Sequence, residues 1–194
     1  QPQMHAMAAL CDSLFKQQGW HLNGQVAISS VIFRLPKVWV ANTRYADLTQ
    51  ELAAQKINVP SAQDIAQAII AVRQRKLPDP ASIPNCGSFF HNPIVSTVQA
   101  AQLKAAHSTL PQYPQPDGRI KLAAGWLIEH CGPESGISWK GFRRGSVGCH
   151  ERQALVLVNY GGAKGEAIYQ LSEDILQSVK TTFGVMLERE VNIL

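Results

Sequence analysis

The stretch Ala154-Leu-Val-Leu-Val158 and the segment Gly161-Gly-Ala-Lys-Gly165 that follows it decide the fold class of this chain. The first is an uninterrupted apolar run rich in valine, which predicts a buried strand. The glycines predict a turn. Beyond them, apolar residues recur at the spacing of one helical face, namely Ile168, Leu171, Ile175, Val179 and Phe183. A strand therefore leads through a short turn into the longest helix of the chain, over about residues 165–183.

The same two periodicities organise the rest of the chain. Helices are predicted over residues 45–54, 61–76, 96–107 and 122–130, and strands over 26–33, 185–191 and short parts of 81–95 and 133–150. Residues 108–118 are rich in proline and are predicted to form a loop. Because helices alternate with strands and no segment repeats, the fold class is α+β or α/β.

The helix over residues 61–76 has both of its ends marked in the sequence. Ser61 and Asp64 have the spacing of a capping pair, and Pro78 cannot continue a helix beyond Lys76. The apolar positions that share one face of this helix are Ala62, Ile65, Ile69 and Val72.

Composition excludes several classes of protein. Of the 194 residues, 45% are hydrophobic and 16% are charged, which is typical of a folded domain rather than a disordered tail, a coiled coil or a collagen-like chain. The apolar run over residues 26–33 is too short to span a membrane, and residues 1–20 do not resemble a signal peptide. We therefore expect a cytoplasmic protein, although Gln1 at the start and an apolar run at Leu194 suggest that both ends are cut.

Charge and cysteine content point to a small-molecule partner at most. The formal net charge of +4 suits an anionic ligand but equally suits no charged partner. The basic residues form only short clusters, which argues against nucleic-acid binding. The four cysteines lack any C-x-x-C spacing and the histidines lack metal-ligand spacing, so reduced thiols and no metal site are expected.

Two segments contain residues suited to binding or catalysis. In Lys76-Leu-Pro-Asp-Pro80, a lysine at a helix end could contact a phosphate or carboxylate, or could simply complement the helix dipole. In Asn85-Cys-Gly-Ser-Phe-Phe-His-Asn-Pro93, a glycine next to Ser88 lets the backbone approach a ligand while the hydroxyl donates a proton, although a packed turn explains the segment as well.

Two further segments are weaker candidates. Gly161-Gly-Ala-Lys-Gly165 lacks the spacing of the known phosphate-binding loops, so an ordinary strand-to-helix turn is favoured. Glu188 and Glu190 share one face of the last predicted strand, which a solvated sheet edge also explains.

Six motifs taken in order are far more specific than any one of them. The chain resembles the UDP-N-acetylenolpyruvoylglucosamine reductases, also called UDP-N-acetylmuramate dehydrogenases, over nearly its whole length. The motifs are Lys76-Leu-Pro-Asp-Pro80, Gly87-Ser-Phe-Phe-x-Asn-Pro93, Tyr113-Pro-Gln-Pro-Asp-Gly118, Lys121-Leu-Ala-Ala-Gly-Trp-Leu-Ile128, Gln153-Ala-Leu-Val-Leu-Val158 and Leu187-Glu-x-Glu-Val191. The segment Arg44-Tyr-Ala-Asp-Leu48 resembles the tyrosine-bearing form of the family.

The resemblance implies a flavoenzyme of peptidoglycan synthesis. In this family NADPH reduces FAD, and the flavin passes a hydride to the enolpyruvyl group of a UDP-sugar to give UDP-N-acetylmuramate. The motif positions imply that Ser88 is the proton donor and Glu190 the second catalytic group. They imply substrate-binding roles for Tyr45, Lys76, Asn92, Lys140 and Gln153. The implied protein is a cytoplasmic monomer with a UDP-sugar as its partner and no nucleic acid or membrane.

The resemblance also implies how the chain is divided. The fold is expected to be α+β, with residues 1–60 as the tail end of a FAD-binding domain, 61–184 as the substrate-binding C-terminal domain and 185–194 as a closing strand that returns to the missing N-terminal domain. The family's flavin site and a catalytic arginine precede this region, so the fragment is expected to be inactive and to bind FAD weakly or not at all. Two alternatives stay open: a non-catalytic UDP-sugar-binding module, or a truncated product without activity.

Overall fold

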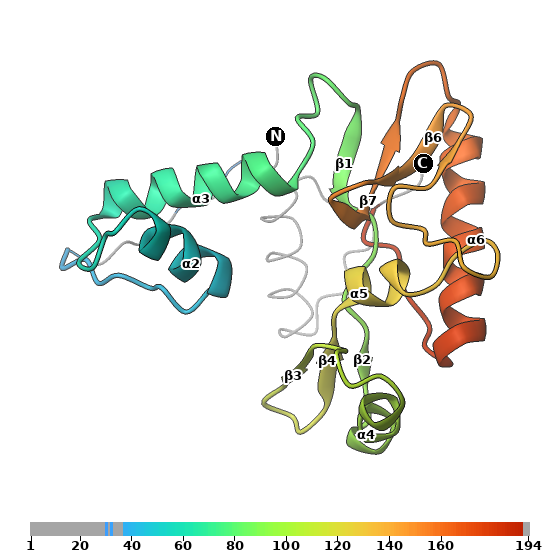
Figure 1. Ribbon diagram of the computed structural model, residues 1–194, viewed down its shortest axis with the longest axis horizontal. Coiled ribbons are helices and arrows are strands. Elements are labelled where there is room, and N and C mark those ends of the chain that lie inside the picture. Colours follow the sequence, from blue (N-terminus) through green and yellow to red (C-terminus); the bar gives the residue numbers. More distant parts are fainter. Residues whose placement is uncertain (1–29, 31, 33–36, 192–194) are drawn as a thin grey trace. The chain divides into compact units, whose positions relative to one another are not determined.

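The computed structural model describes residues 30, 32 and 37–191 in two compact units (Figure 1). One unit extends to Ile69 and the other begins at Ile70, so the division falls within helix α3 (Ala62–Lys76). The strand predicted over residues 26–33 lies outside the described residues, apart from two isolated positions.

The first unit contains helix α2 (Ala46–Ala54) and the beginning of α3. Its small core consists of Leu48, Leu52 and Ala68, with Ile57 and Ile65 packed against it. The predicted cap of α3 is confirmed. The carboxylate of Asp64 accepts hydrogen bonds from the amide (2.8 Å) and the hydroxyl (2.6 Å) of Ser61, whose Oγ in turn accepts from the Asp64 amide at 3.2 Å.

The predicted apolar face of α3 is partly wrong. Ala68 and Val72 are buried, whereas Ile69 is 42% exposed and Ala62 is also exposed. Ile65 and Val72 of the predicted face are partly or fully buried, and Ala68, at the position before Ile69, takes the place predicted for Ile69. The end of the helix at Lys76, ahead of Pro78, is confirmed.

The second unit is built on two antiparallel sheets. The four-stranded sheet has the order β1-β7-β6-β5, and the three-stranded sheet has the order β2-β4-β3. The first contains β1 (Asn85–Ser88), β5 (Arg143–Arg144), β6 (Val147–His150) and β7 (Gln153–Asn159). The second contains β2 (Ile94–Val95), β3 (Gln112–Pro114) and β4 (Ile120–Leu122). Antiparallel sheets with helices packed against them establish the α+β class.

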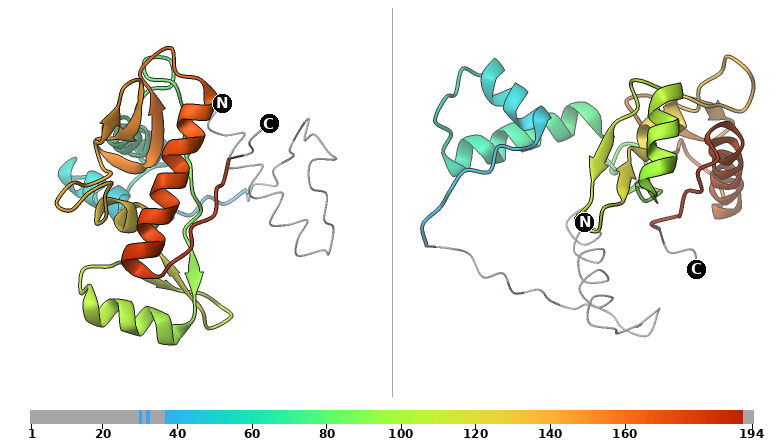
Figure 2. Two further views of the ribbon diagram at one scale, coloured as in Figure 1. Left: turned by 90° about the vertical axis from the view of Figure 1, so that its right-hand side faces the viewer. Right: turned by 90° about the horizontal axis from the view of Figure 1, so that it is seen from below.

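Three helices complete this unit: α4 (Thr97–Ala106), α5 (Ala124–Glu129) and α6 (Gly165–Phe183). Figure 2 shows α6 lying along the four-stranded sheet, where it contacts β6 and β7. The predicted bounds of α6 are confirmed, and its buried residues Leu171, Ile175, Val179 and Phe183 form the expected stripe. Together with Phe90, Leu127 and Leu157, this stripe belongs to one continuous core.

Two other predictions of secondary structure are wrong in part. The predicted loop over residues 108–118 contains β3, which pairs with β4 at the edge of its sheet, where a proline is tolerated. Residues 185–191 form no continuous strand. Their strand pairing is limited to one isolated antiparallel bridge, between Phe90 and Arg189, although Val185 and Leu187 are buried in the predicted alternation.

Three of the four cysteines lie within the described residues. Cys86, Cys131 and Cys149 are free thiols, while Cys11 lies outside the described residues. Burial raises the pKa of Cys149 to about 12. Within residues 37–191, no group of three or more histidine, cysteine or acidic side chains could hold a metal ion, and no helix combines the length and apolar character that crossing a membrane requires.

Candidate functional site

The two predicted catalytic residues lie on segments that are joined through their backbones. Ser88 ends β1 opposite Val156 of β7, and the next amide, that of Phe89, donates to the carbonyl of Leu155 at 2.8 Å. On its other side, the carbonyl of Phe89 accepts a hydrogen bond from the amide of Glu190 at 2.9 Å. The segment that carries Glu190 therefore lies directly beside the segment that carries Ser88.

Local structure presents Ser88 to solvent. Gly87 has a φ of +81°, which a side chain would disfavour, and its amide donates to Asn85 Oδ1 at 3.0 Å. The two residues after Ser88, Phe89 and Phe90, are buried with their rings edge to face at a centroid distance of 5.4 Å. Two anchored aromatic rings hold the segment in place and leave the serine exposed.

A residue that the sequence reasoning did not single out contacts Glu190. The Nδ1 atom of His91 lies 3.6 Å from Oε2 of Glu190, and the His91 amide donates to the carbonyl of Glu188 at 2.8 Å. The side chains are 51% and 32% exposed, so both can meet a ligand. His91 occupies the unspecified position of the motif Gly87-Ser-Phe-Phe-x-Asn-Pro93, and no local signal in the sequence predicts its contact with Glu190.

Arg189 holds the Glu190 segment on α6. Its Nε donates to Ser172 Oγ at 2.8 Å, its guanidinium is bonded to the carboxylate of Glu173, and it lies over the ring of Tyr169 at 4.6 Å. The hydrogen bond from Arg189, followed by one from Tyr169, lowers the pKa of Glu173. Arg189 is the unspecified residue between the two glutamates of its motif, so sequence reasoning missed it as well.

Asn92 and Gln153 each lie against the first turn of α5. Asn92 Oδ1 accepts a hydrogen bond from the amide of Ala124 at 2.9 Å and so caps the helix. A Cβ placed on Gly125 would lie 3.0 Å from Gln153 Oε1, so the side chain of Gln153 lies against the same turn of α5. The amide groups of two predicted substrate-binding residues are therefore close to one short helix.

Lys140 lies at the other end of α5. Its Nζ is 2.7 Å from Oε1 of Glu129, the last residue of that helix, and both side chains are about one third to two fifths exposed. An ion pair of this kind is compatible with a structural role as well as with anion binding.

Lys76 and Tyr45 belong to different units. Lys76 is the last residue of α3. The carbonyl of the residue before it, Arg75, accepts a hydrogen bond at 2.8 Å from Arg152, which precedes Gln153 in the chain. Tyr45 is the N-cap residue of α2 in the first unit and is largely exposed. The structure thus places Ser88, Asn92, Lys140, Gln153 and Glu190 in the second unit with Lys76, and Tyr45 in the first.

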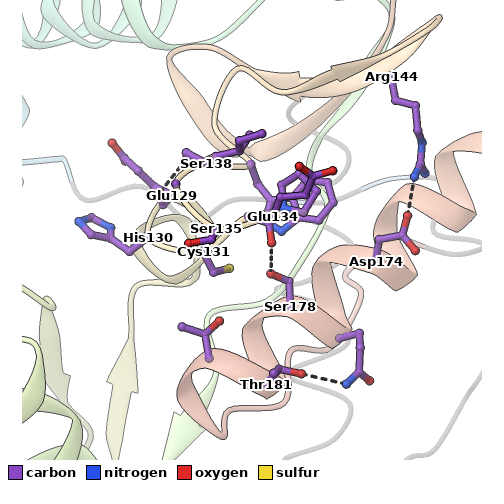
Figure 3. Close-up of a pocket in the computed structure, with 17 residues that line it drawn as sticks. Glu129, His130, Cys131, Glu134, Ser135, Ser138, Arg144, Asp174, Ser178 and Thr181 are labelled. Carbon is purple, nitrogen blue, oxygen red and sulfur yellow. Dashed lines mark hydrogen bonds and ion pairs between the residues drawn. The ribbon is translucent and has the colours of Figure 1, made fainter.

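A separate cavity of about 900 Å³ lies between α6 and residues 129–139, which comprise the end of α5 and the loop after it (Figure 3). Asp174, Ser178 and Thr181 line it from one face of α6. Ser178 Oγ donates to the carbonyl of Gly132 at 2.9 Å, and Arg144 is paired with Asp174 at 2.7 Å. Ser88 and Glu190 are not among the residues that line this cavity, so it is distinct from the predicted catalytic residues.

In the glycine-rich turn before α6, two backbone amides already have a partner within the turn. Asn159 Oδ1 accepts hydrogen bonds from the amides of Gly161 at 2.9 Å and Ala163 at 3.3 Å, so these two donors are not available to an anion. Residues 161–165 connect β7 to α6, which agrees with the predicted position of a turn between a strand and the longest helix. Among the described residues, the other helices do not open on a glycine-rich turn.

Comparison with known proteins gives one consistent result. Residues 79–194 match the family described as UDP-N-acetylenolpyruvoylglucosamine reductase, C-terminal domain. Proteins named UDP-N-acetylenolpyruvoylglucosamine reductase are similar over 92% of this chain. Those of Dechloromonas aromatica, Azoarcus sp. and Burkholderia lata are 62%, 53% and 49% identical, respectively. The aligned region is 51%, 49% and 49% of their lengths, so the chain spans about half of each of these relatives.

Proposed function

Because the chain belongs to the UDP-N-acetylenolpyruvoylglucosamine reductase family, as its match to the C-terminal domain establishes, we propose that it forms the substrate-binding half of such a reductase. The reaction would be the NADPH-dependent reduction of UDP-N-acetylglucosamine enolpyruvate to UDP-N-acetylmuramate for peptidoglycan synthesis. FAD supplies the hydride in this chemistry, and the other half of the reductase would hold it. The proposed setting is the cytoplasm, and the proposed state is a monomer.

The observation that carries this proposal is the backbone pairing between the Ser88 and Glu190 segments. Residues almost at opposite ends of the second unit are brought together by the hydrogen bond from the Glu190 amide to the Phe89 carbonyl. Acid–base catalysis requires its groups to be fixed near one another, and the backbone pairing of the two segments supports that arrangement.

The roles of the two residues follow from where charge develops. Hydride addition to the carbon β to the substrate carboxylate makes negative charge build up as an enolate, and a proton must then reach the α carbon. The Ser88 hydroxyl is a neutral donor that is exposed to a ligand. Glu190 is the second catalytic group, and His91 contacts its carboxylate. A positioned proton donor contributes about 10²–10⁴ in rate.

The remaining residues would bind the anionic UDP-sugar. Lys76 and Tyr45 are proposed to contact the diphosphate, and Lys140 to add a further positive charge. The amides of Asn92 and Gln153, gathered at the beginning of α5, would donate to the substrate.

The decisive experiment uses the chain joined to the N-terminal half of its reductase. Ser88→Ala is expected to leave the reduction of FAD by NADPH unchanged and to slow flavin reoxidation by the substrate about 10²–10⁴-fold. Ser135→Ala, on an exposed loop, is the matched control and should reoxidise at the wild-type rate. Loss of both half-reactions in Ser88→Ala would show that Ser88 is structural, and an unchanged reoxidation rate would refute its role.

Titration of the 194-residue chain with the UDP-sugar separates the alternatives. Binding without turnover by the joined protein would favour a non-catalytic binding module. No binding together with a broad, non-cooperative thermal transition would favour a truncated product without activity.

A further inference from the structure

We propose that Arg189 is a positioning residue that sets the register of the Glu190 segment against the Ser88 segment. This inference rests on the role proposed above for Glu190. Arg189 would act through the backbone and through α6, and it would not itself take part in the chemistry.

The first observation is how completely Arg189 is held. Its side chain is only 19% exposed, and its contacts to Tyr169, Ser172 and Glu173 all lie within one and a half turns of α6. Ser172 is fully buried, and its Oγ also donates to the carbonyl of Tyr169 at 2.6 Å, so this hydroxyl has a fixed direction. A planar guanidinium with several fixed partners tolerates very little displacement.

The second observation is the register that this anchoring fixes. Phe90 and Arg189 are directly opposite, and the amides of His91 and Glu190 donate to the carbonyls of Glu188 and Phe89 on either side of that pair. A slip of one residue in such a pairing would move every side chain to the opposite face. Glu190 would then no longer lie where its carboxylate meets His91.

The third observation is that the other contacts described for residues 185–191 define the register less sharply than Arg189 does. The single bridge at Arg189 replaces a full strand ladder, and Val185 and Leu187 are apolar anchors whose non-directional burial specifies position poorly. The hydrogen bonds and the ion pair of Arg189 are directional and therefore select one register.

Hydrogen exchange on the 194-residue chain tests this without any cofactor. Arg189→Met should accelerate exchange of the Glu190 and His91 amides by about 10–100-fold, which is the loss expected when a hydrogen-bonded charged group is removed. The matched control is Arg144→Met, which removes another arginine paired with α6, at Asp174, and should leave these two amides within about twofold of wild type. Equal protection in Arg189→Met and wild type would overturn the inference.

A second variant covers the case in which Arg189→Met unfolds the chain. Glu173→Gln removes the charge from one partner of the guanidinium and leaves the hydrogen bond from Arg189 to Ser172. It should accelerate the same two amides less than Arg189→Met, while the amides within β7 keep their protection. Uniform acceleration across the unit would contradict a local positioning role.

The joined reductase then separates this inference from the proposed function. Arg189→Met should slow flavin reoxidation by the substrate and leave the substrate dissociation constant within about threefold of wild type. The double variant Arg189→Met/Glu190→Gln should be no slower than Glu190→Gln alone, because both changes would disable the same group. If Glu190→Gln reoxidises at the wild-type rate, the proposed role of Glu190 fails. If Glu190→Gln is slow and Arg189→Met is not, only the positioning role of Arg189 fails.

Discussion

Asn92 has two predicted roles that can be separated by substitution. Its Oδ1 caps α5 by accepting from the Ala124 amide at 2.9 Å, and its NH₂ group is proposed to donate to the substrate. Asn92→Ala removes both groups, whereas Asn92→Asp keeps an oxygen for the cap and removes the donor. The pair of variants therefore distinguishes a structural residue from a binding residue.

The expected loss of stability in Asn92→Ala depends on how deeply the Ala124 amide that Asn92 caps is buried. Ala124 is fully buried while Asn92 covers it, so Asn92→Ala removes the partner of its N–H at a part-buried position. Loss of an N-cap costs about 0.5–2 kcal/mol, and an unsatisfied buried donor costs about 1–3 kcal/mol. We expect a loss of about 1–2 kcal/mol, which lowers Tm by roughly 4–8 °C for a unit of this size. Aspartate caps helices as well as asparagine does, so Asn92→Asp should stay within about 1 °C of wild type.

Circular dichroism during thermal unfolding measures the stability, and calorimetric titration with the UDP-sugar measures the binding. Asn92→Asp should lose about tenfold or more in affinity, because a donor is replaced by a negative charge beside an anionic ligand. The control is Asn42→Ala, in an exposed turn of the first unit, which should change neither quantity of the second unit. A Tm for Asn92→Asp as low as that of Asn92→Ala would refute the capping argument, and unchanged affinity would refute the binding role.

Gly132, Cys149 and Glu173 can be tested independently in other parts of the second unit. Gly132→Ala should destabilise it severely, by several degrees in Tm or more, because the new Cβ would lie 1.4 Å from the carbonyl oxygen of Ile137, and a fully native Tm would contradict this packing. The thiol of Cys149, with its pKa raised to about 12, should resist alkylation at pH 8 in the folded chain and react once the chain is denatured, and rapid labelling of the native protein would be inconsistent with its burial. Arg189 lowers the pKa of Glu173, so the stabilisation from this pair should be fully present above about pH 4.3 and be lost as the pH falls through the lower pKa of the folded state. Glu173→Gln should therefore make the stability of the unit fall less steeply at acid pH. An unaltered pH dependence would show that the pair contributes nothing.

Local patterns in the sequence predicted what depends on local physics. The bounds of α6 were predicted because a glycine turn precedes a regular apolar period of 3.6 residues. The start of α3 was predicted because Ser61 and Asp64 satisfy each other within three residues. Strand β3 was missed because its pairing partner, β4, and not its own proline-rich composition, makes it a strand.

The candidate site divides in the same way. The motifs supplied Ser88 and Glu190 through resemblance, but no periodicity predicts that their segments pair. His91 and Arg189 were missed because their contacts are with residues remote in the chain or on another element, and they occupy unspecified positions of the motifs. Only the three-dimensional structure shows that His91 contacts Glu190 and that Arg189 anchors the Glu190 segment on α6.

The bridge between Phe90 and Arg189 also constrains the order in which this fold can form. It closes a loop of roughly a hundred residues, and closing such a loop costs about 2 kcal/mol more in chain entropy than closing one of ten residues. The hairpin of β6 and β7 needs only a short turn and can form early. During synthesis, the Ser88 segment cannot pair with Glu190 until almost all of the second unit has been made. A chain that ended between Leu187 and Arg189 would keep every strand of both sheets and α6, and would still leave the proposed catalytic pair unassembled.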